Sequence, residues 1–365
     1  MTITRVLHYG MSSTLGGIET FIMNVYRNID RSTIQFDFIT FEENIVFEKE
    51  ILSLGGKIYK MIPRKKNLLK NYIEINNFFK EHPEYKKIHF HLNTCSYITP
   101  IIAATKNYNR DIIIHSHSAW QGSNFRIKLF HFFNRRRVIR KSDYLIACST
   151  EAAVYMYGSN IKKYELIPNA INVEKFKFNH KIRKTIRVNL NIENKFVFGH
   201  VGRLSFPKNH LFLLDIYLEI YKTRKDVVLL LIGAGELEND IREKVIKYGL
   251  YDSVIMLGAR EDISDLMQAM DFFIFPSYFE GFPITLIEAQ ASGLPCLMSD
   301  SISSEVMITD NINMESLNNS ANAWAERIMN SLHIPSREGR DNILIDSKFS
   351  MENLVAKLTE IYLAE

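Results

Sequence analysis

Several features that would fix the class of this protein are missing from its sequence. The 365 residues contain three cysteines, Cys95, Cys148 and Cys296, and no two of them form a Cys-x-x-Cys pair. This argues against a disulfide framework or a zinc site, and it suits a reducing compartment. No uncharged apolar run approaches the roughly 18 residues that cross a bilayer, and no basic-then-apolar leader opens the chain. We therefore expect a cytoplasmic protein.

Two ligand-binding motifs are also missing. No Asp-x-Asp pair occurs, so the sequence offers no such site for Mg²⁺ or Mn²⁺ beside a nucleotide phosphate. The turn after the first expected strand contains Gly16-Gly17 and lacks the G-x-G-x-x-G of a dinucleotide site. We expect no metal ion and no tightly bound cofactor. Gly17 can still let the backbone approach a ligand closely, although an ordinary strand-to-helix turn explains the pair equally well.

The charge of the chain, +4 in total, is divided unevenly. Residues 1–175 contain 25 Lys+Arg and 15 Asp+Glu, a balance of +10, which leaves −6 for the remainder. The densest basic segment, 125–141, mixes Phe, Leu and Ile with Arg and Lys at near-helical spacing. Such a helix can lie on an anionic membrane surface. A surface helix whose apolar side chains face the protein's own core is an equal alternative.

The hydrophobic pattern alternates between strands and helices in two successive series, which predicts an α/β protein with parallel sheets covered on both faces. Expected strands lie at 3–9, 35–41, 57–62, 87–91, 111–115, 143–148, 195–201, 227–232, 254–257, 271–275 and 294–298. Expected helices include 20–28, 46–54, 70–81, 97–107, 125–141, 211–221, 237–248, 263–270, 284–291 and 351–364. A polar, cationic stretch separates the series. We assign 1–175 to a first domain and 176–349 to a second, and expect 350–365 to cross back to the first.

The segment 279–289 carries the strongest chemical signal. Glu280 follows a buried strand, Pro283 favours a helix start, and Glu288 lies just inside that helix. In an open α/β sheet, ligands bind at the carboxyl ends of strands. The helix start favours an anion and the carboxylates accept hydrogen bonds from hydroxyls, so a sugar carrying phosphate fits this site. Two solvated glutamates in an ordinary loop remain the alternative.

Other strand ends carry residues of matching chemistry. Arg203 and Lys208 follow the strand at 195–201 and can clamp a diphosphate, unless both are simply solvated. Gly235 lies in the turn after the strand at 227–232, where backbone groups can meet a nucleoside, although this signal is weak. His115 and His117 close the strand at 111–115, and either imidazole can donate a hydrogen bond to a sugar hydroxyl, although two histidines at this spacing are more often structural.

Together these segments resemble the retaining glycosyltransferases of family 4, which have the GT-B fold. The resemblance spans nearly the whole chain. Its motifs are Gly16-Gly17-Ile-Glu, Ile167-Pro-Asn169, Val201-Gly-Arg203 with Lys208-Asn, Gly233-Ala-Gly235-Glu, Glu280 with Glu288, and Ala291-Ser-Gly293-Leu-Pro295. It is similar above all to transferases of bacterial exopolysaccharide and capsule synthesis. It implies two Rossmann-like domains facing a cleft, with the donor held mainly by the second.

The resemblance also implies roles for individual residues. Arg203 and Lys208 would hold the diphosphate, Glu288 the ribose hydroxyls and Glu280 the donor sugar. His117, chosen over His115, would touch that sugar. The remaining expected donor contacts come from backbone-exposing positions: Gly17, Gly235, Gly281, Phe282, Pro283 and Ile284.

The implied reaction is front-face substitution on a nucleotide sugar, expected to be a UDP-sugar, in which cations and amide dipoles stabilise the leaving diphosphate. The implied acceptor is a lipid-linked glycan, and no nucleic acid is expected as a partner. A UDP-sugar 2-epimerase or another enzyme of this fold, and a non-catalytic nucleotide-sugar binder, remain open. The base, the sugar, the linkage and the oligomeric state are not determined by the sequence.

Overall fold

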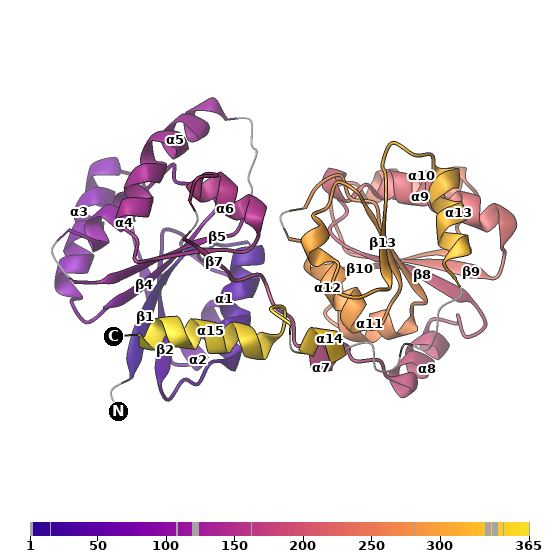
Figure 1. Ribbon diagram of the computed structural model, residues 1–365, viewed down its shortest axis with the longest axis horizontal. Helices are drawn as coiled ribbons and strands as arrows, with labels where there is room; N and C mark the ends of the chain where they lie inside the picture. The colour runs from indigo at the N-terminus through magenta and orange to yellow at the C-terminus, as the bar shows by residue number, and fades with distance from the viewer. Residues whose placement is uncertain are drawn as a thin grey trace. The chain divides into compact units, whose positions relative to one another are not determined.

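The chain folds into two compact units, which are described separately (Figure 1). The first contains Met1–Ala170 and Met351–Glu365, and the second contains Ile171–Ser350. The computed structural model describes residues 3–14, 16–106, 109–118, 124–161, 163–280, 282–332, 337, 342–345 and 347–364.

The first unit is built on a parallel sheet of seven strands in the order β3-β2-β1-β4-β5-β6-β7. Its strands are Thr4–Tyr9 (β1), Ile34–Thr40 (β2), Ile58–Lys60 (β3), Lys87–Leu92 (β4), Asp111–Ser116 (β5), Tyr144–Ala147 (β6) and Glu165–Leu166 (β7). Its helices are Gly17–Asn28 (α1), Glu48–Ser53 (α2), Leu68–Glu81 (α3), Thr99–Ala104 (α4), Phe125–Arg140 (α5), Thr150–Tyr157 (α6) and Met351–Leu363 (α15). Successive strand residues face opposite layers: Val6 packs with α1, α2 and α15, and Leu7 packs with α3, α4 and α6.

The second unit repeats this plan with six parallel strands in the order β10-β9-β8-β11-β12-β13. Its strands are Phe196–Val201 (β8), Val227–Ile232 (β9), Val254–Gly258 (β10), Phe272–Phe275 (β11), Cys296–Ser299 (β12) and Ile312–Glu315 (β13). Its α-helices are Val173–Phe176 (α7), His180–Asn189 (α8), His210–Thr223 (α9), Glu238–Lys247 (α10), Ile263–Ala269 (α11), Ile284–Ala291 (α12), Ala321–Asn330 (α13) and Asn342–Ile345 (α14). Short 3₁₀ turns cover Phe206–Lys208 (η1) and Ser304–Val306 (η2). Every residue of β9 is buried, as expected for a strand covered on both faces.

The C-terminal helix belongs to the first unit, as the sequence predicts. Leu354, Leu358 and Tyr362 of α15 are buried in the core layer that α1 also covers, and Figure 1 shows α15 close to α1. The unit boundary lies slightly earlier than 175/176. Ile171 and Val173 belong to the second unit because their side chains are buried in its core.

Several elements of the second unit do not show in the sequence pattern, among them β13 and α8. Beyond the expected strand at 294–298, a further strand, β13, pairs in parallel with β12. Its four residues, Ile-Asn-Met-Glu, form an edge strand too short and too polar to show a strand pattern. The polar stretch taken as a linker contains α8, in which Arg183 and Arg187 donate to carbonyls at the end of α11 and pair with Asp271. These cations have a structural partner that the sequence pattern does not show.

Each sheet reverses its strand order once, between β1 and β4 in the first unit and between β8 and β11 in the second. The carboxyl ends of strands that flank such a reversal form a natural ligand crevice in open α/β sheets. The loops after these four strands carry most of the predicted site residues. No helix in the described part of the chain is long and apolar enough to cross a membrane.

Candidate functional site

The loops after β8 and β11 bring Lys208 and Glu280 together. The Nζ atom of Lys208 lies 2.7 Å from Oε1 of Glu280, and the two side chains are only 17% and 11% exposed. Lys208 ends the 3₁₀ turn η1, and its ammonium also lies 5.0 Å from the ring centre of Phe275, the last residue of β11. The backbone joins the same loops, because the N–H of Tyr278 donates to the carbonyl of Pro207. A charge pair therefore stands at the reversal point of the second sheet.

Three buried oxygens of the segment from β11 to α12 lack hydrogen-bond partners among the described residues. They are Oγ of Ser277, Oε1 of Glu280 and Oγ1 of Thr285. The Lys208–Glu280 contact satisfies an ion-pair distance without hydrogen-bond alignment, so Oε1 keeps its accepting capacity. Buried polar atoms are rarely left unpaired. These three oxygens are therefore available to a polar ligand. The two hydroxyls were not singled out from the sequence.

The start of α12 contains the backbone positions that were predicted to contact the donor. Pro283 precedes the helix, and the N–H of Ile284 donates to the carbonyl of Phe282 over 3.0 Å. In this conformation the amide of Ile284 is therefore occupied, whereas that of Phe282 has no backbone partner in the described part of the chain. The ring of Phe282 stacks on Phe349, which fixes the loop. Gly281, also predicted to contact the donor, lies outside the described residues.

Glu288 is placed on the next turn of α12. Burial raises the pKa of its carboxyl to about 7, and the positive charge of Lys175 partly offsets that rise. Lys175 belongs to α7, which packs against α12. A carboxyl that titrates near neutral pH can gain or lose its charge when a ligand binds. The sequence showed Glu288 but gave no sign that the charge of Lys175 would act on it.

Arg203 and Gly235 lie in neighbouring loops after β8 and β9. Nη2 of Arg203 is 3.2 Å from Oε2 of Glu236, and both side chains are well exposed. A Cβ on Gly235 would lie 2.3 Å from the carbonyl oxygen of Leu204, so only glycine fits there. The structure thus gives Gly235 a packing role between the two loops. In the described part of the chain, no ion pair joins Arg203 to Lys208 or Glu280.

The predicted residues of the first unit differ in accessibility. Gly17 starts α1 at the surface, and a Cβ built on it would meet nothing within 4 Å. His115 is fully buried, whereas His117 is partly exposed. Of the two histidines, only His117 reaches the surface of its unit. Its Nε2 is 2.9 Å from Nδ1 of His91, a contact that the sequence did not predict.

Helix α5 presents an unusual surface. Its large apolar side chains are mostly exposed: Phe125, Leu129, Phe130, Phe132 and Phe133. Only His131 and Val138 are buried. The alternative in which these aromatic residues face the protein's own core is therefore wrong for this helix. The basic residues of α5 alternate with this exposed apolar surface: Arg126, Lys128, Arg135, Arg136, Arg137 and Arg140.

Comparison with known proteins identifies the family. A family profile described as "Glycosyl transferases group 1" matches residues 182–361, and one described as "Glycosyltransferase Family 4" matches residues 15–175. The chain is 32% identical over 370 residues to the putative glycosyltransferase EpsF of Bacillus subtilis (strain 168), covering 98% of this chain and 96% of EpsF. The chain belongs to glycosyltransferase family 4.

A second sequence relative and a solved structure extend the comparison. An Escherichia coli enzyme named UDP-Gal:alpha-D-GlcNAc-diphosphoundecaprenol alpha-1,3-galactosyltransferase is 30% identical over 213 residues, which cover 55% of this chain and 54% of that enzyme. The crystal structure of HepE from Anabaena in complex with UDP superimposes with a TM-score of 0.79 at 19% identity, over 98% of this chain and 99% of HepE. The family 4 assignment and the GT-B fold predicted from the sequence are confirmed.

Proposed function

We propose that this family 4 glycosyltransferase moves a sugar from a UDP-sugar to a hydroxyl of a lipid-linked glycan, with retention of configuration, during synthesis of a bacterial surface polysaccharide. The observation that carries the proposal is the Lys208–Glu280 pair beside the start of α12, at the reversal point of the second sheet. The named relatives support the choice of donor and acceptor. HepE has been crystallised with UDP, and the E. coli relative is named for UDP-Gal and a diphosphoundecaprenol-linked acceptor.

The site residues supply complementary charges for such a donor. Lys208 offers a largely buried ammonium to the diphosphate, and the amide of Phe282 offers a donor at the positive end of α12. Glu280, with a hydrogen-bonding oxygen still unused, accepts from sugar hydroxyls. Glu288 accepts from the ribose. When the diphosphate binds, the ammonium of Lys208 exchanges the carboxylate of Glu280 for the diphosphate, so the ammonium has a counter-charge in both states.

Transfer then depends on charge placement and orientation. In front-face substitution, the bond from the anomeric carbon to the diphosphate oxygen breaks, and the acceptor oxygen forms its bond on the same side. The departing phosphate takes the acceptor's proton, so no enzyme nucleophile is required. Lys208, and Arg203 once it leaves Glu236, would stabilise the growing charge on the diphosphate. His117 would orient the sugar by a hydrogen bond.

The exposed surface of α5 supports a site of action at a membrane. Rings that lie exposed beside guanidinium groups suit the interface between lipid headgroups and acyl chains. We propose that α5 docks the first unit on an anionic membrane, where a lipid-linked acceptor resides. The exposed rings Phe132 and Phe133, at 62% and 65% exposure, would enter the lipid.

The decisive test is transfer by the purified full chain. The protein is incubated with UDP-, GDP- and ADP-sugars, with and without an undecaprenyl-diphosphate-linked acceptor, and products are identified by mass spectrometry and by NMR of the new linkage. We expect the new linkage to have the same anomeric configuration as the sugar in the donor. We also expect transfer to persist in EDTA. Epimerised free sugar formed without acceptor would replace this proposal with an epimerase. Inverted linkage or loss of transfer in EDTA would overturn the retaining, metal-independent mechanism.

A further inference from the structure

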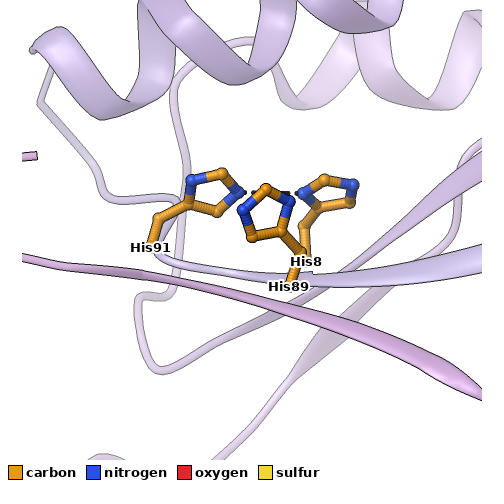
Figure 2. A group of neighbouring side chains, drawn as sticks. All are labelled: His8, His89 and His91. Carbon is orange, nitrogen blue, oxygen red and sulfur yellow. Dashed lines mark hydrogen bonds between the residues drawn. The ribbon is translucent and has the colours of Figure 1, made fainter. Parts of the chain in front are cut away.

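A chain of three imidazoles runs through the core of the first unit. Nδ1 of His8 lies 3.0 Å from Nε2 of His91, and Nδ1 of His91 lies 2.9 Å from Nε2 of His117. Figure 2 shows the link between His8 and His91, with the ring of His89 beside it. His8 comes from β1 and His91 from β4, while His117 directly follows β5. The register of these parallel strands places all three side chains on one face of the sheet.

The surroundings of this histidine chain (His8, His91 and His117) are aromatic. Phe21 of α1 packs at 5.9 Å from His91 and 5.1 Å from His117, measured between ring centres. On the other side, Tyr362 of α15 packs edge-on to His8 at 6.1 Å. Burial lowers the pKa of His8 and His117 to about 3, and that of His91 falls well below its ordinary value. All three imidazoles are therefore neutral at pH 7.

Neutrality makes the hydrogen bonds of the histidine chain directional. A neutral imidazole carries one N–H and one lone pair, so it donates from one nitrogen and accepts at the other. His91 uses both nitrogens, and it must donate to one neighbour and accept from the other. The proton positions of His8, His91 and His117 are consequently linked: either all three protons lie on Nδ1 or all three lie on Nε2.

The closed end of the chain decides between these two states. Nε2 of His8 is buried and has no hydrogen-bond partner among the described residues. If the protons lay on Nε2, His8 would bury an N–H group without an acceptor. If they lie on Nδ1, the Nε2 atom of His8 buries only an unused lone pair, which is the more common and less costly of the two. We propose that His91, backed by His8, is a positioning residue that holds His117 as a hydrogen-bond donor through its Nδ1–H.

This inference rests on the proposed function in one respect, the contact between His117 and the donor sugar. A ring fixed with its proton on Nδ1 presents a donor to a hydroxyl oxygen without first changing tautomer. The other nitrogen is already occupied by His91, which also fixes the ring's orientation. His91 itself need not touch the substrate. It acts through His117, much as the partner of a ligating histidine sets which nitrogen carries the proton.

A metal ion is a poorer explanation for the same cluster. Nitrogens of His8, His89 and His91, and of His91, His115 and His117, lie within 4.8 Å of one another. However, the rings of His89 and His91 are stacked at 4.0 Å, as are those of His115 and His117. Imidazole binds a metal in the plane of its ring, so stacked rings do not direct their nitrogens at one ion. The nitrogens of His91 are also both hydrogen-bonded.

The first test measures proton positions in the unaltered protein. Histidine labelled with ¹⁵N is incorporated, and long-range ¹H–¹⁵N correlation spectra are recorded at pH 7.5, with His117→Gln used to assign its signals. We expect Nδ1-protonated rings for His91 and His117. Protonation of His117 at Nε2, or one equivalent of Zn²⁺ bound with loss of these patterns, overturns the proposal. The NMR measurement does not require transfer activity, so its result can be distinguished from a failure of the proposed function.

The second test separates positioning from packing. His91→Leu removes the donor to His117, His91→Asn keeps an amide donor near the same place, and His89→Leu is the matched control on the same buried strand. We expect His91→Leu to mix the His117 tautomers and lower kcat/KM about tenfold, the usual worth of one hydrogen bond, while His91→Asn restores most of it. Equal losses in His91→Leu and His89→Leu, with His117 unchanged in both spectra, would show a packing role alone and overturn the proposal.

Discussion

The ammonium of Lys208 and the carboxylate of Glu280 neutralise each other at 2.7 Å in a nearly enclosed site. The pair joins the loop after β8 to the loop after β11, the two strands at which the second sheet reverses its order. An anionic ligand that enters must compete with Glu280 for Lys208. The pair is therefore both a local tie between loops and the proposed contact for the leaving group.

Substitution of Lys208 should impair both catalysis and stability. Lys208→Ala is expected to lower kcat/KM by about 10²–10³, because it removes charge stabilisation of the leaving diphosphate. It also leaves the largely buried Glu280 without its counter-charge, at a cost of about 2 kcal/mol in the free energy of unfolding. Steady-state kinetics and urea titration measure the two effects. Lys225→Ala, an exposed cation elsewhere in the same unit, is the control.

The double variant Lys208→Ala/Glu280→Gln distinguishes the two roles. Because the second substitution removes the orphaned charge, we expect it to recover stability relative to Lys208→Ala and to recover no activity. Normal turnover in Lys208→Ala would reject its role at the diphosphate.

Binding of a UDP-sugar should strengthen as pH rises through neutrality. Burial raises the pKa of Glu288 to about 7, and the ionised carboxylate is the better acceptor for ribose hydroxyls. Since the folded pKa exceeds the unfolded one, this group stabilises the apo fold at low pH and loses that contribution as pH rises toward 8. Isothermal titration calorimetry from pH 6 to 8 should show rising affinity in the wild type and a flat profile in Glu288→Gln. An identical profile in both proteins would remove Glu288 from the nucleotide site.

Two glycines offer a matched pair of substitutions. Gly235→Ala would place a Cβ 2.3 Å from the carbonyl oxygen of Leu204, so the loops after β8 and β9 must separate. We expect a loss on the order of 2 kcal/mol in unfolding free energy and weaker donor binding. Gly17→Ala meets no neighbour within 4 Å and should leave the melting temperature unchanged. If its activity nevertheless falls, the loop before α1 takes part in the reaction, as the family resemblance implies.

Membrane docking through α5 can be tested by flotation with liposomes. Wild-type protein should float with vesicles that contain anionic lipid and less with neutral ones, because both the rings and the guanidinium groups contribute. Phe132→Ser/Phe133→Ser should abolish flotation. Ile246→Ser, which removes a 70% exposed apolar side chain from the second unit, should not. Flotation that survives the double substitution would assign the exposed rings of α5 another partner.

Most of the fold can be predicted from the sequence, because short local patterns of residues indicate its strands and helices. Buried strands such as β9 appear as unbroken apolar runs, and the stop of α12 at Gly293, which has a φ of +67°, follows from its residue type. The edge strand β13 was not predicted, because its four residues are half polar and too few to show the alternation of apolar and polar positions that is typical of a strand. Helix α8 was not predicted for a related reason. Its arginines pair with Asp271, which is distant in the sequence, and the sequence does not show which residue a cation pairs with.

By itself, the sequence determined the family, the alternation of strands and helices, and the set of polar residues at strand ends. Only the tertiary structure decided which of them meet: Lys208 with Glu280, Arg203 with Glu236, and His91 with His117. The physical reason is that the spacing of apolar residues along a strand or helix shows which face a residue occupies, whereas the order and register of the strands decide which residues become its neighbours. Those depend on the packing of the whole sheet, which brings distant segments of the chain side by side.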